Sequence, residues 1–169
     1  MKPHFQMMAA YNQWANERLY AAAQTLSDAE YRADRGAFFG SVHRTLNHIL
    51  VGDRIWMYRF TGEGETYTEL DIVPFDDTRH LGAARKAEDE RIISWVDGLS
   101  EDRLAGTFSY RTISNPSDRT QPLSPALAHF FNHQTHHRGQ VHALLSGFGI
   151  DPPSLDLIMF QRGSGMGAS

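Results

Sequence analysis

Cysteine is absent from the 169-residue chain. Its absence excludes disulfide bonds, a cysteine nucleophile and thiolate ligands, so any metal ion has to be held by nitrogen and oxygen donors. No apolar run approaches the roughly 18 residues that a membrane span requires, and no hydrophobic stretch of signal-peptide length follows the first residues. The sequence therefore predicts a cytoplasmic protein that does not enter the membrane.

Clustered positive charge is also missing. The chain has 16 Lys and Arg against 20 Asp and Glu, a formal net charge of −4. No dense basic segment offers a surface for a phosphate backbone or an anionic membrane, so neither is an expected partner. The composition, 41% hydrophobic and 21% charged, is typical of a packed globule. We expect one domain over residues 1–162 and a flexible tail over 163–169.

Helical periodicity dominates what is present. Apolar residues recur at helical spacing in four long segments, which are 4–26, 41–60, 76–100 and 124 to 147 or 149. Ser41 is a suitable N-cap for the second segment, and Ser27 with Glu30 predicts a short capped turn before it. In the fourth segment we expect Ser124 at the N-cap and Pro125 at the first helical position.

Residues between the third and fourth long segments follow a different pattern. The string "GTFSYRTI" alternates in the manner of a strand, and "SNPSD" supplies turn residues, which predicts a small hairpin. The late string "DPPSLDLIMFQR" is expected to pack back on the helices. The fold class is therefore all-α, a four-helix bundle with a small β-hairpin-like excursion between helices three and four.

Histidines are concentrated in the string "NHQTHHRGQVH", residues 132–142. On a helix His133 and His137 lie about 40° apart on one face, with His129 about 40° to the other side of His133. Such a pair can share a cation, and one further donor leaves an open coordination position, as in catalytic zinc sites. The same spacing also arises by chance in a histidine-rich chain. A zincin peptidase is disfavoured because Gln134 stands where that motif has Glu.

Three strings resemble the DinB family of metal-dependent bundle proteins, which is related to metal-dependent thiol-transfer isomerases. They are "NHQTHHRGQV", "TLNHILVGDRIW" and "HFQMMAAYNQWANERLY", and the similarity spans nearly the whole chain. The resemblance implies that His48, His133 and His137 bind one divalent ion. Helical periodicity alone would not select His48, because it lies away from the apolar stripe of its own segment.

Other polar residues have two interpretations each. His129 is either a core or supporting residue or a fourth ligand, and Arg138 and Gln140 either anchor a substrate or tie the fourth helix to its neighbours. Groups that accept a hydrogen bond from the ring N–H of a ligating histidine orient its ring, and the candidates here are Asn47, Asp53 and Asn132. The remaining histidines are expected at the surface: His4, His43, His80, His136 and His142.

The implied ion sets the expected function. Three neutral imidazoles leave a divalent ion its full charge, which favours deprotonation of a bound water or thiol. We expect a hydrolase or thiol transferase that acts on a small-molecule substrate, with zinc or nickel as the ion, and we assign no catalytic side chain. The resemblance alone suggests a low-molecular-weight thiol cofactor and a homodimer. The alternatives are a non-enzymatic stress-response protein with a structural ion, and a metal-free bundle that dimerises through apolar faces.

Overall fold

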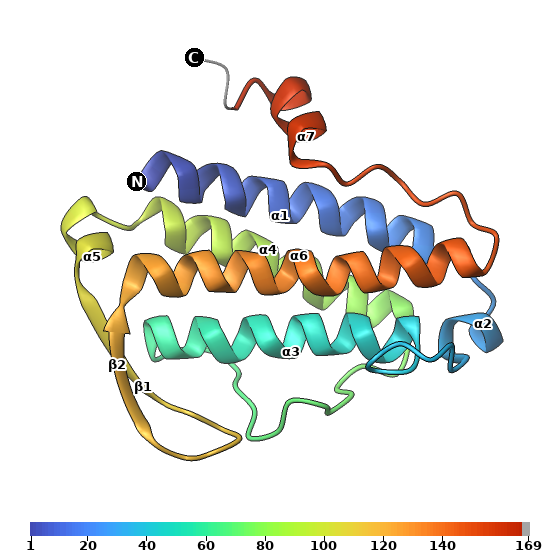
Figure 1. The fold of residues 1–169 in the computed structure, drawn as a ribbon, viewed down its shortest axis with the longest axis horizontal. Coiled ribbons are helices and arrows are strands. Elements are labelled where there is room, and N and C mark those ends of the chain that lie inside the picture. Colours follow the sequence, from blue (N-terminus) through green and yellow to red (C-terminus); the bar gives the residue numbers. More distant parts are fainter. Residues whose placement is uncertain (167–169) are drawn as a thin grey trace.

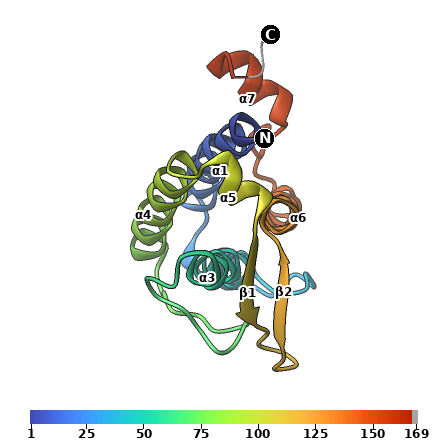
Figure 2. The same ribbon diagram turned by 90° about the vertical axis from the view of Figure 1, so that its left-hand side faces the viewer.

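Four long helices form the body of the protein in a computed structural model, which describes residues 1–166. They are α1 (Lys2–Ala23), α3 (Val42–Thr61), α4 (Thr78–Asp97) and α6 (Leu123–Gly147). Viewed along the bundle, they occupy four corners, with α1 beside α4 and α6, and α3 beside the same two helices (Figure 2). The prediction of a four-helix bundle is confirmed.

Short helices join or follow the long ones (Figure 1). The capping box of Ser27 and Glu30 starts α2 (Asp28–Arg32), as predicted. The expected segment 76–100 contains α4 alone, and Ser100 at its end caps a further short helix that was not predicted, α5 (Glu101–Ala105). The last helix, α7 (Leu157–Ser164), packs against α1 and runs two residues into the predicted tail. The rest of that prediction, at 167–169, lies outside the described residues.

A β-hairpin connects α5 to α6, as predicted. Strands β1 (Thr107–Arg111) and β2 (Asp118–Pro122) pair antiparallel, and they lie beside α3 and α6. The start of α6 was predicted two residues too late, because Pro122 is its N-cap and Ser124 lies within its first turn. The hydroxyl of Ser124 donates to the backbone carbonyl of Leu104 and so is not available as a cap.

Buried side chains form three layers along the bundle. At the hairpin end, an apolar cluster is built around aromatic residues such as Phe60 and Phe130. At the opposite end, a second apolar cluster contains Leu46 and Leu145. Between the two lies a layer of buried polar and charged side chains from all four long helices: Asn12, Asn16, Asp53, Arg85, Asp89, Gln134 and Arg138. The polar layer therefore crosses the middle of the bundle.

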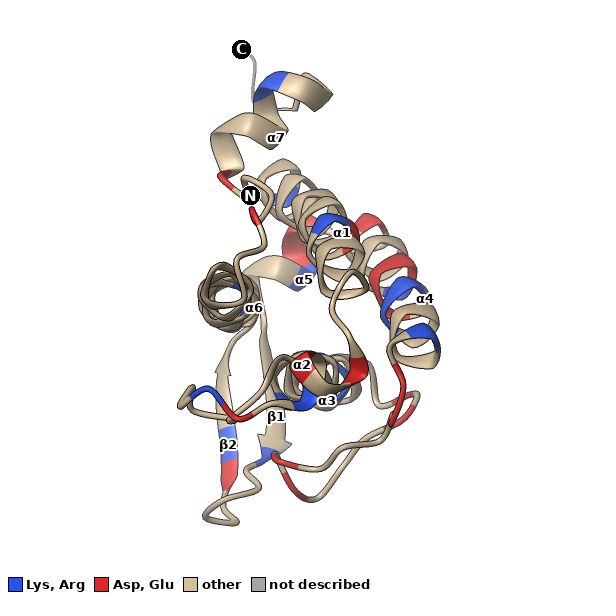
Figure 3. Ribbon diagram, turned by 90° about the vertical axis from the view of Figure 1, so that its right-hand side faces the viewer, with Lys and Arg blue, Asp and Glu red and all other residues tan. Residues whose placement is uncertain are grey.

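Charged residues are distributed unevenly over the helices. Several acidic and several basic residues lie along α4, whereas α6 carries Arg138 as its one Lys, Arg, Asp or Glu residue (Figure 3). Hence α6 brings imidazoles to the bundle but no carboxylates. None of the described helices is both long enough and apolar enough to span a membrane.

Candidate metal site

Three histidines meet where α3 packs against α6. One ring nitrogen from each of His48, His133 and His137 lies within 4.8 Å of the others. The Nε2 atoms of His133 and His137 are 3.1 Å apart, and the ring centroid of His48 is 5.3 Å and 4.6 Å from theirs. The structure thus brings together the three residues that the family resemblance singled out.

Hydrogen bonds fix the tautomers of two of these rings. The Nδ1 of His48 lies 2.8 Å from the backbone carbonyl of Leu70, and the Nδ1 of His137 lies 2.9 Å from Oε1 of Gln140. Both partners are oxygens that accept, so each Nδ1 carries the proton and each Nε2 has a free lone pair. The Nε2 of His48 is buried and makes no hydrogen bond to the described residues.

The donor set fits a divalent ion. Metal–nitrogen distances of about 2.0–2.1 Å place two ligand nitrogens of a tetrahedral site about 3.3 Å apart, close to the 3.1 Å between His133 and His137. The buried, unpartnered Nε2 of His48 faces the same cluster, and an unpaired buried acceptor is costly unless something binds it. An ion held by three imidazoles accounts for both features.

Backbone and aromatic neighbours shape the cluster. Gly52 follows His48 by one turn of α3, and a Cβ atom at Gly52 would lie 3.0 Å from Cε1 of His133. Glycine therefore makes room for the His133 ring against α3. On the other side Phe39 stacks on His48, with centroids 3.9 Å apart and the planes inclined by 24°.

The environment keeps the three rings neutral. Burial lowers the pKa of His48 to about 4 and that of His133 to about 3, and the neighbouring imidazoles act in the same direction. The pKa of His137 is also lowered, again chiefly by burial. Because metal ions bind the neutral imidazole, these rings are in the ligating form at neutral pH.

A cavity of about 420 Å³ opens beside the histidines. Its walls include His48, His133, Trp56 and residues of the hairpin such as Tyr110. A small molecule in this cavity would therefore touch the ligand cluster directly.

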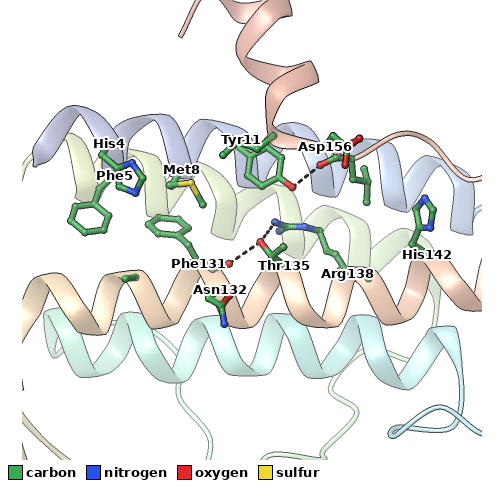
Figure 4. Close-up of a pocket in the computed structure, with 14 residues that line it drawn as sticks. His4, Phe5, Met8, Tyr11, Phe131, Asn132, Thr135, Arg138, His142 and Asp156 are labelled. Atoms are coloured by element: carbon green, nitrogen blue, oxygen red, sulfur yellow. Dashed lines mark hydrogen bonds between the residues drawn. The ribbon is translucent and has the colours of Figure 1, made fainter. Parts of the chain in front are cut away.

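A larger cavity of about 580 Å³ lies between α1, α6 and the segment before α7 (Figure 4). It is lined by Phe5, Met8, Phe131 and Arg138, among others, and contains none of the three clustered histidines. The smaller cavity is the one that adjoins the candidate site.

His129 lies at the edge of the candidate site and is exposed. Its ring centroid is 6.0 Å from that of His133, and it packs edge-on against Trp56. In the described part of the chain, the group of clustered donors contains His48, His133 and His137 but not His129.

The three residues predicted to orient the histidine rings have other partners in the structure. Asn47 bonds the backbone of Phe75 and so holds the loop before α4, Asp53 pairs with Arg85 and Gln134, and Asn132 faces the larger cavity. The prediction for these three is therefore wrong. Leu70 and Gln140 take that role, and a carbonyl such as that of Leu70 leaves no side-chain signal in a sequence.

Two further expectations are resolved by hydrogen bonds. Arg138 ties α6 to α1, because its guanidinium donates to Asn12 and Asn16. His43 is buried rather than exposed, since the loop after α3 covers it and its Nε2 lies 2.9 Å from the carbonyl of Phe75. His4, His80 and His136 are exposed as expected, and His142 is partly buried at the larger cavity.

Known proteins resemble this chain in sequence or in fold. Protein DinB of Bacillus subtilis (strain 168) is 25% identical over 161 residues, covering 89% of this chain and 91% of that protein. A DinB-like protein from Bacillus cereus ATCC 10987 superposes with a TM-score of 0.63 at 18% identity, over 83% of this chain and 89% of the other.

YfiT from Bacillus subtilis, a probable metal-dependent hydrolase with an unusual four-helix bundle topology, superposes with a TM-score of 0.64. It is 15% identical, and the match covers 85% of this chain and 87% of YfiT. At that identity the likeness shows a shared fold. The family model of the DinB family matches residues 1–166, and the chain belongs to that family.

Proposed function

We propose that this protein is a mononuclear, divalent-metal-dependent enzyme, a hydrolase or a thiol transferase, that acts on a small molecule. His48, His133 and His137 would hold the ion. The observation that carries the proposal is the convergence of three neutral imidazoles beside a cavity of about 420 Å³. The description of YfiT as a probable metal-dependent hydrolase supports the same class of activity.

The donor set suits zinc or nickel, since both accept imidazole ligands. When bound, the ion supplies Lewis acidity to a water, thiol or carbonyl group in the cavity. The chain itself supplies the orientation of the ligands. The Leu70 carbonyl and the Gln140 amide hold the protonated Nδ1 atoms, so the bare Nε2 atoms of His48 and His137 stay turned into the cluster. The thiol-transferase alternative rests on the family resemblance.

A purely structural ion is the competing role. Structural zinc sites usually fill four positions with protein ligands, whereas this cluster offers three. The cavity against His48 and His133 also favours an open coordination position. We further propose that the protein is cytoplasmic and that it is a homodimer, and sedimentation of the purified protein would test the dimer.

Metal analysis of protein purified without a His tag tests the ligand assignment. We expect about one divalent ion per chain in the wild type and background levels in His48→Ala and His133→Ala. His142→Ala, on the same helix but outside the cluster, is the matched control and should keep its ion. Circular dichroism establishes that each variant is folded. Unchanged metal content in folded His48→Ala and His133→Ala would remove the assignment.

The open position is tested separately. In cobalt-substituted protein, the visible absorption spectrum should change when a small thiol is added, because cobalt spectra report the ligands of the ion. A spectrum that does not respond indicates a closed, structural site.

A further inference from the structure

Arg59 lies in an unusual setting on α3. Its guanidinium carbon is 4.6 Å from the ring centroids of both Trp56 and Tyr110, and its partial burial lowers its pKa. It forms no salt bridge with the described residues, whereas Arg54 pairs with Glu65 and Glu88. A guanidinium that is partly removed from water and lacks a carboxylate is ready to bind an anion.

Arg119 brings a second positive charge to the same cavity. It lies directly opposite Tyr110 in the hairpin register, and side chains directly opposite one another share a face of the sheet. Arg119 lines the cavity, as do Arg59 and Tyr110. Arg111, one residue along β1 and hence on the other face, instead pairs with Asp118 at 3.0 Å.

Negative side chains are missing from the cavity wall. None of the described residues that line it is Asp or Glu, although the whole chain has a formal net charge of −4. The wall also contains an aromatic pair, Trp56 and Tyr110, whose ring centroids are 5.5 Å apart. The cavity therefore combines two cations, an apolar surface and the histidine cluster.

We propose that this cavity binds a small molecule through an anionic group, a carboxylate or a phosphate, held by Arg59 with Arg119 beside it. Trp56 and Tyr110 pack against an apolar part of the same molecule. Planar oxyanions accept two parallel hydrogen bonds from a guanidinium, and a few placed polar groups in an otherwise apolar wall are typical of ligand sites. As a statement about the substrate, the proposal rests on the proposed function; as a statement about binding, it does not.

Binding is measured on metal-free wild-type protein at pH 8, where imidazoles of ordinary pKa are neutral. The probes are benzoate, phenyl phosphate, inorganic phosphate and uncharged benzyl alcohol, each titrated by calorimetry and by amide chemical shifts. Benzoate and phenyl phosphate should bind at least about tenfold more tightly than benzyl alcohol, the size of effect expected for a charge-assisted hydrogen bond. Comparison of benzoate with the two phosphates distinguishes the anionic groups.

Arg59→Gln should weaken binding of the preferred anion about tenfold or more. Arg18→Gln is the matched control, because the Arg18 guanidinium also lies over a tryptophan, 4.4 Å from Trp14, but does not line this cavity. It should bind as the wild type does. Equal affinity for benzoate, phenyl phosphate and benzyl alcohol would overturn the proposal, as would equal affinity of wild type and folded Arg59→Gln for the preferred anion.

The two proposals fail in different ways. If His48→Ala and His133→Ala keep their metal, the proposed enzyme loses its ion, while anion binding by the metal-free protein is unaffected. If the metal-free protein does not bind the anions, but His48→Ala and His133→Ala lose their metal, the substrate proposal alone is wrong. Arg59→Gln should keep the metal content of the wild type, because Arg59 is not in the ligand cluster.

Discussion

Gly52 lies against the imidazole of His133, so that a Cβ atom at Gly52 would stand 3.0 Å from Cε1 and 3.5 Å from Nδ1 of that ring. Both neighbours are side-chain atoms of a candidate ligand. Glycine in a helix interior costs about 1 kcal/mol relative to alanine. Helix α3 therefore carries a destabilising residue at the position where the His133 ring needs room.

Gly52→Ala should separate metal affinity from fold stability. The added methyl group moves the His133 ring, so we expect a loss of metal affinity of about 10- to 100-fold, the range seen when groups that orient ligands are removed. Competition with a chromophoric chelator measures it. Gly139→Ala is the control, since a Cβ at Gly139 on α6 meets nothing within 4 Å. Unchanged affinity in Gly52→Ala would show that the ring does not need this space.

Sequence patterns predicted the helices better than the site. Caps such as Ser27 and Ser41 are local, and the structure places both at helix starts. Periodicity also put His133 and His137 on one face. It could not select His48, because apolar periodicity reports burial against neighbouring helices, whereas His48 is covered by Phe39 and bonded to Leu70, residues from loops on either side of α3.

Gln140 should control the orientation of His137. Its Oε1 accepts from Nδ1 of His137 at 2.9 Å, and the two residues are neighbours at i and i+3 on one helix. Gln140→Leu keeps the approximate size and removes the acceptor, so the ring loses its fixed tautomer. We expect about 10- to 100-fold weaker metal binding, measured by the same competition. Gln6→Leu is the control, because Gln6 lies on α1, bonds Asp97 and is not part of the histidine cluster; it should not change the metal affinity.

Metal retention should be insensitive to pH over an unusually wide range. Protons compete with the ion only near the pKa of the ligands, which burial lowers to about 4 for His48 and about 3 for His133. Dialysis at a series of pH values should leave the metal content unchanged from pH 8 to about 5.5, below the ordinary imidazole value of about 6.5. Loss of the ion with a midpoint at the ordinary value would contradict the buried environment of the rings.

The same shifts predict the stability of the metal-free protein. Below about pH 6.5 the unfolded chain protonates these histidines, while in the folded chain His48 stays neutral down to about 4 and His133 down to about 3. The unfolded state then binds more protons, so the free energy of unfolding falls as the pH is lowered from 6.5 toward 4. In the double variant His48→Ala/His133→Ala, the free energy of unfolding measured by urea denaturation should depend less steeply on pH over this range than in the wild type.

Arg85 is the central cation of the buried polar layer. Its guanidinium pairs with Asp53 at 2.5 Å and with Asp89 at 2.9 Å, and all three side chains are at most 2% exposed. Asp53 in turn accepts from Gln134, the residue after His133. Arg85→Met leaves two buried carboxylates without this cation, and removing one partner of a buried ion pair costs about 3–5 kcal/mol. Urea denaturation of the metal-free protein at pH 8 measures the loss.

A pH series distinguishes lost charge pairing from lost packing in Arg85→Met. Burial already raises the pKa of Asp53 to about 6, and Arg85 opposes that rise. Without Arg85 the pKa of Asp53 in the folded state rises further above its value in the unfolded state, so the folded state takes up protons as the pH falls. The difference in free energy of unfolding between wild type and Arg85→Met should therefore shrink between pH 8 and pH 5. Arg111→Met, which breaks an exposed pair with Asp118, should cost at most about 1 kcal/mol. A deficit for Arg85→Met that does not change with pH would instead assign the loss to packing.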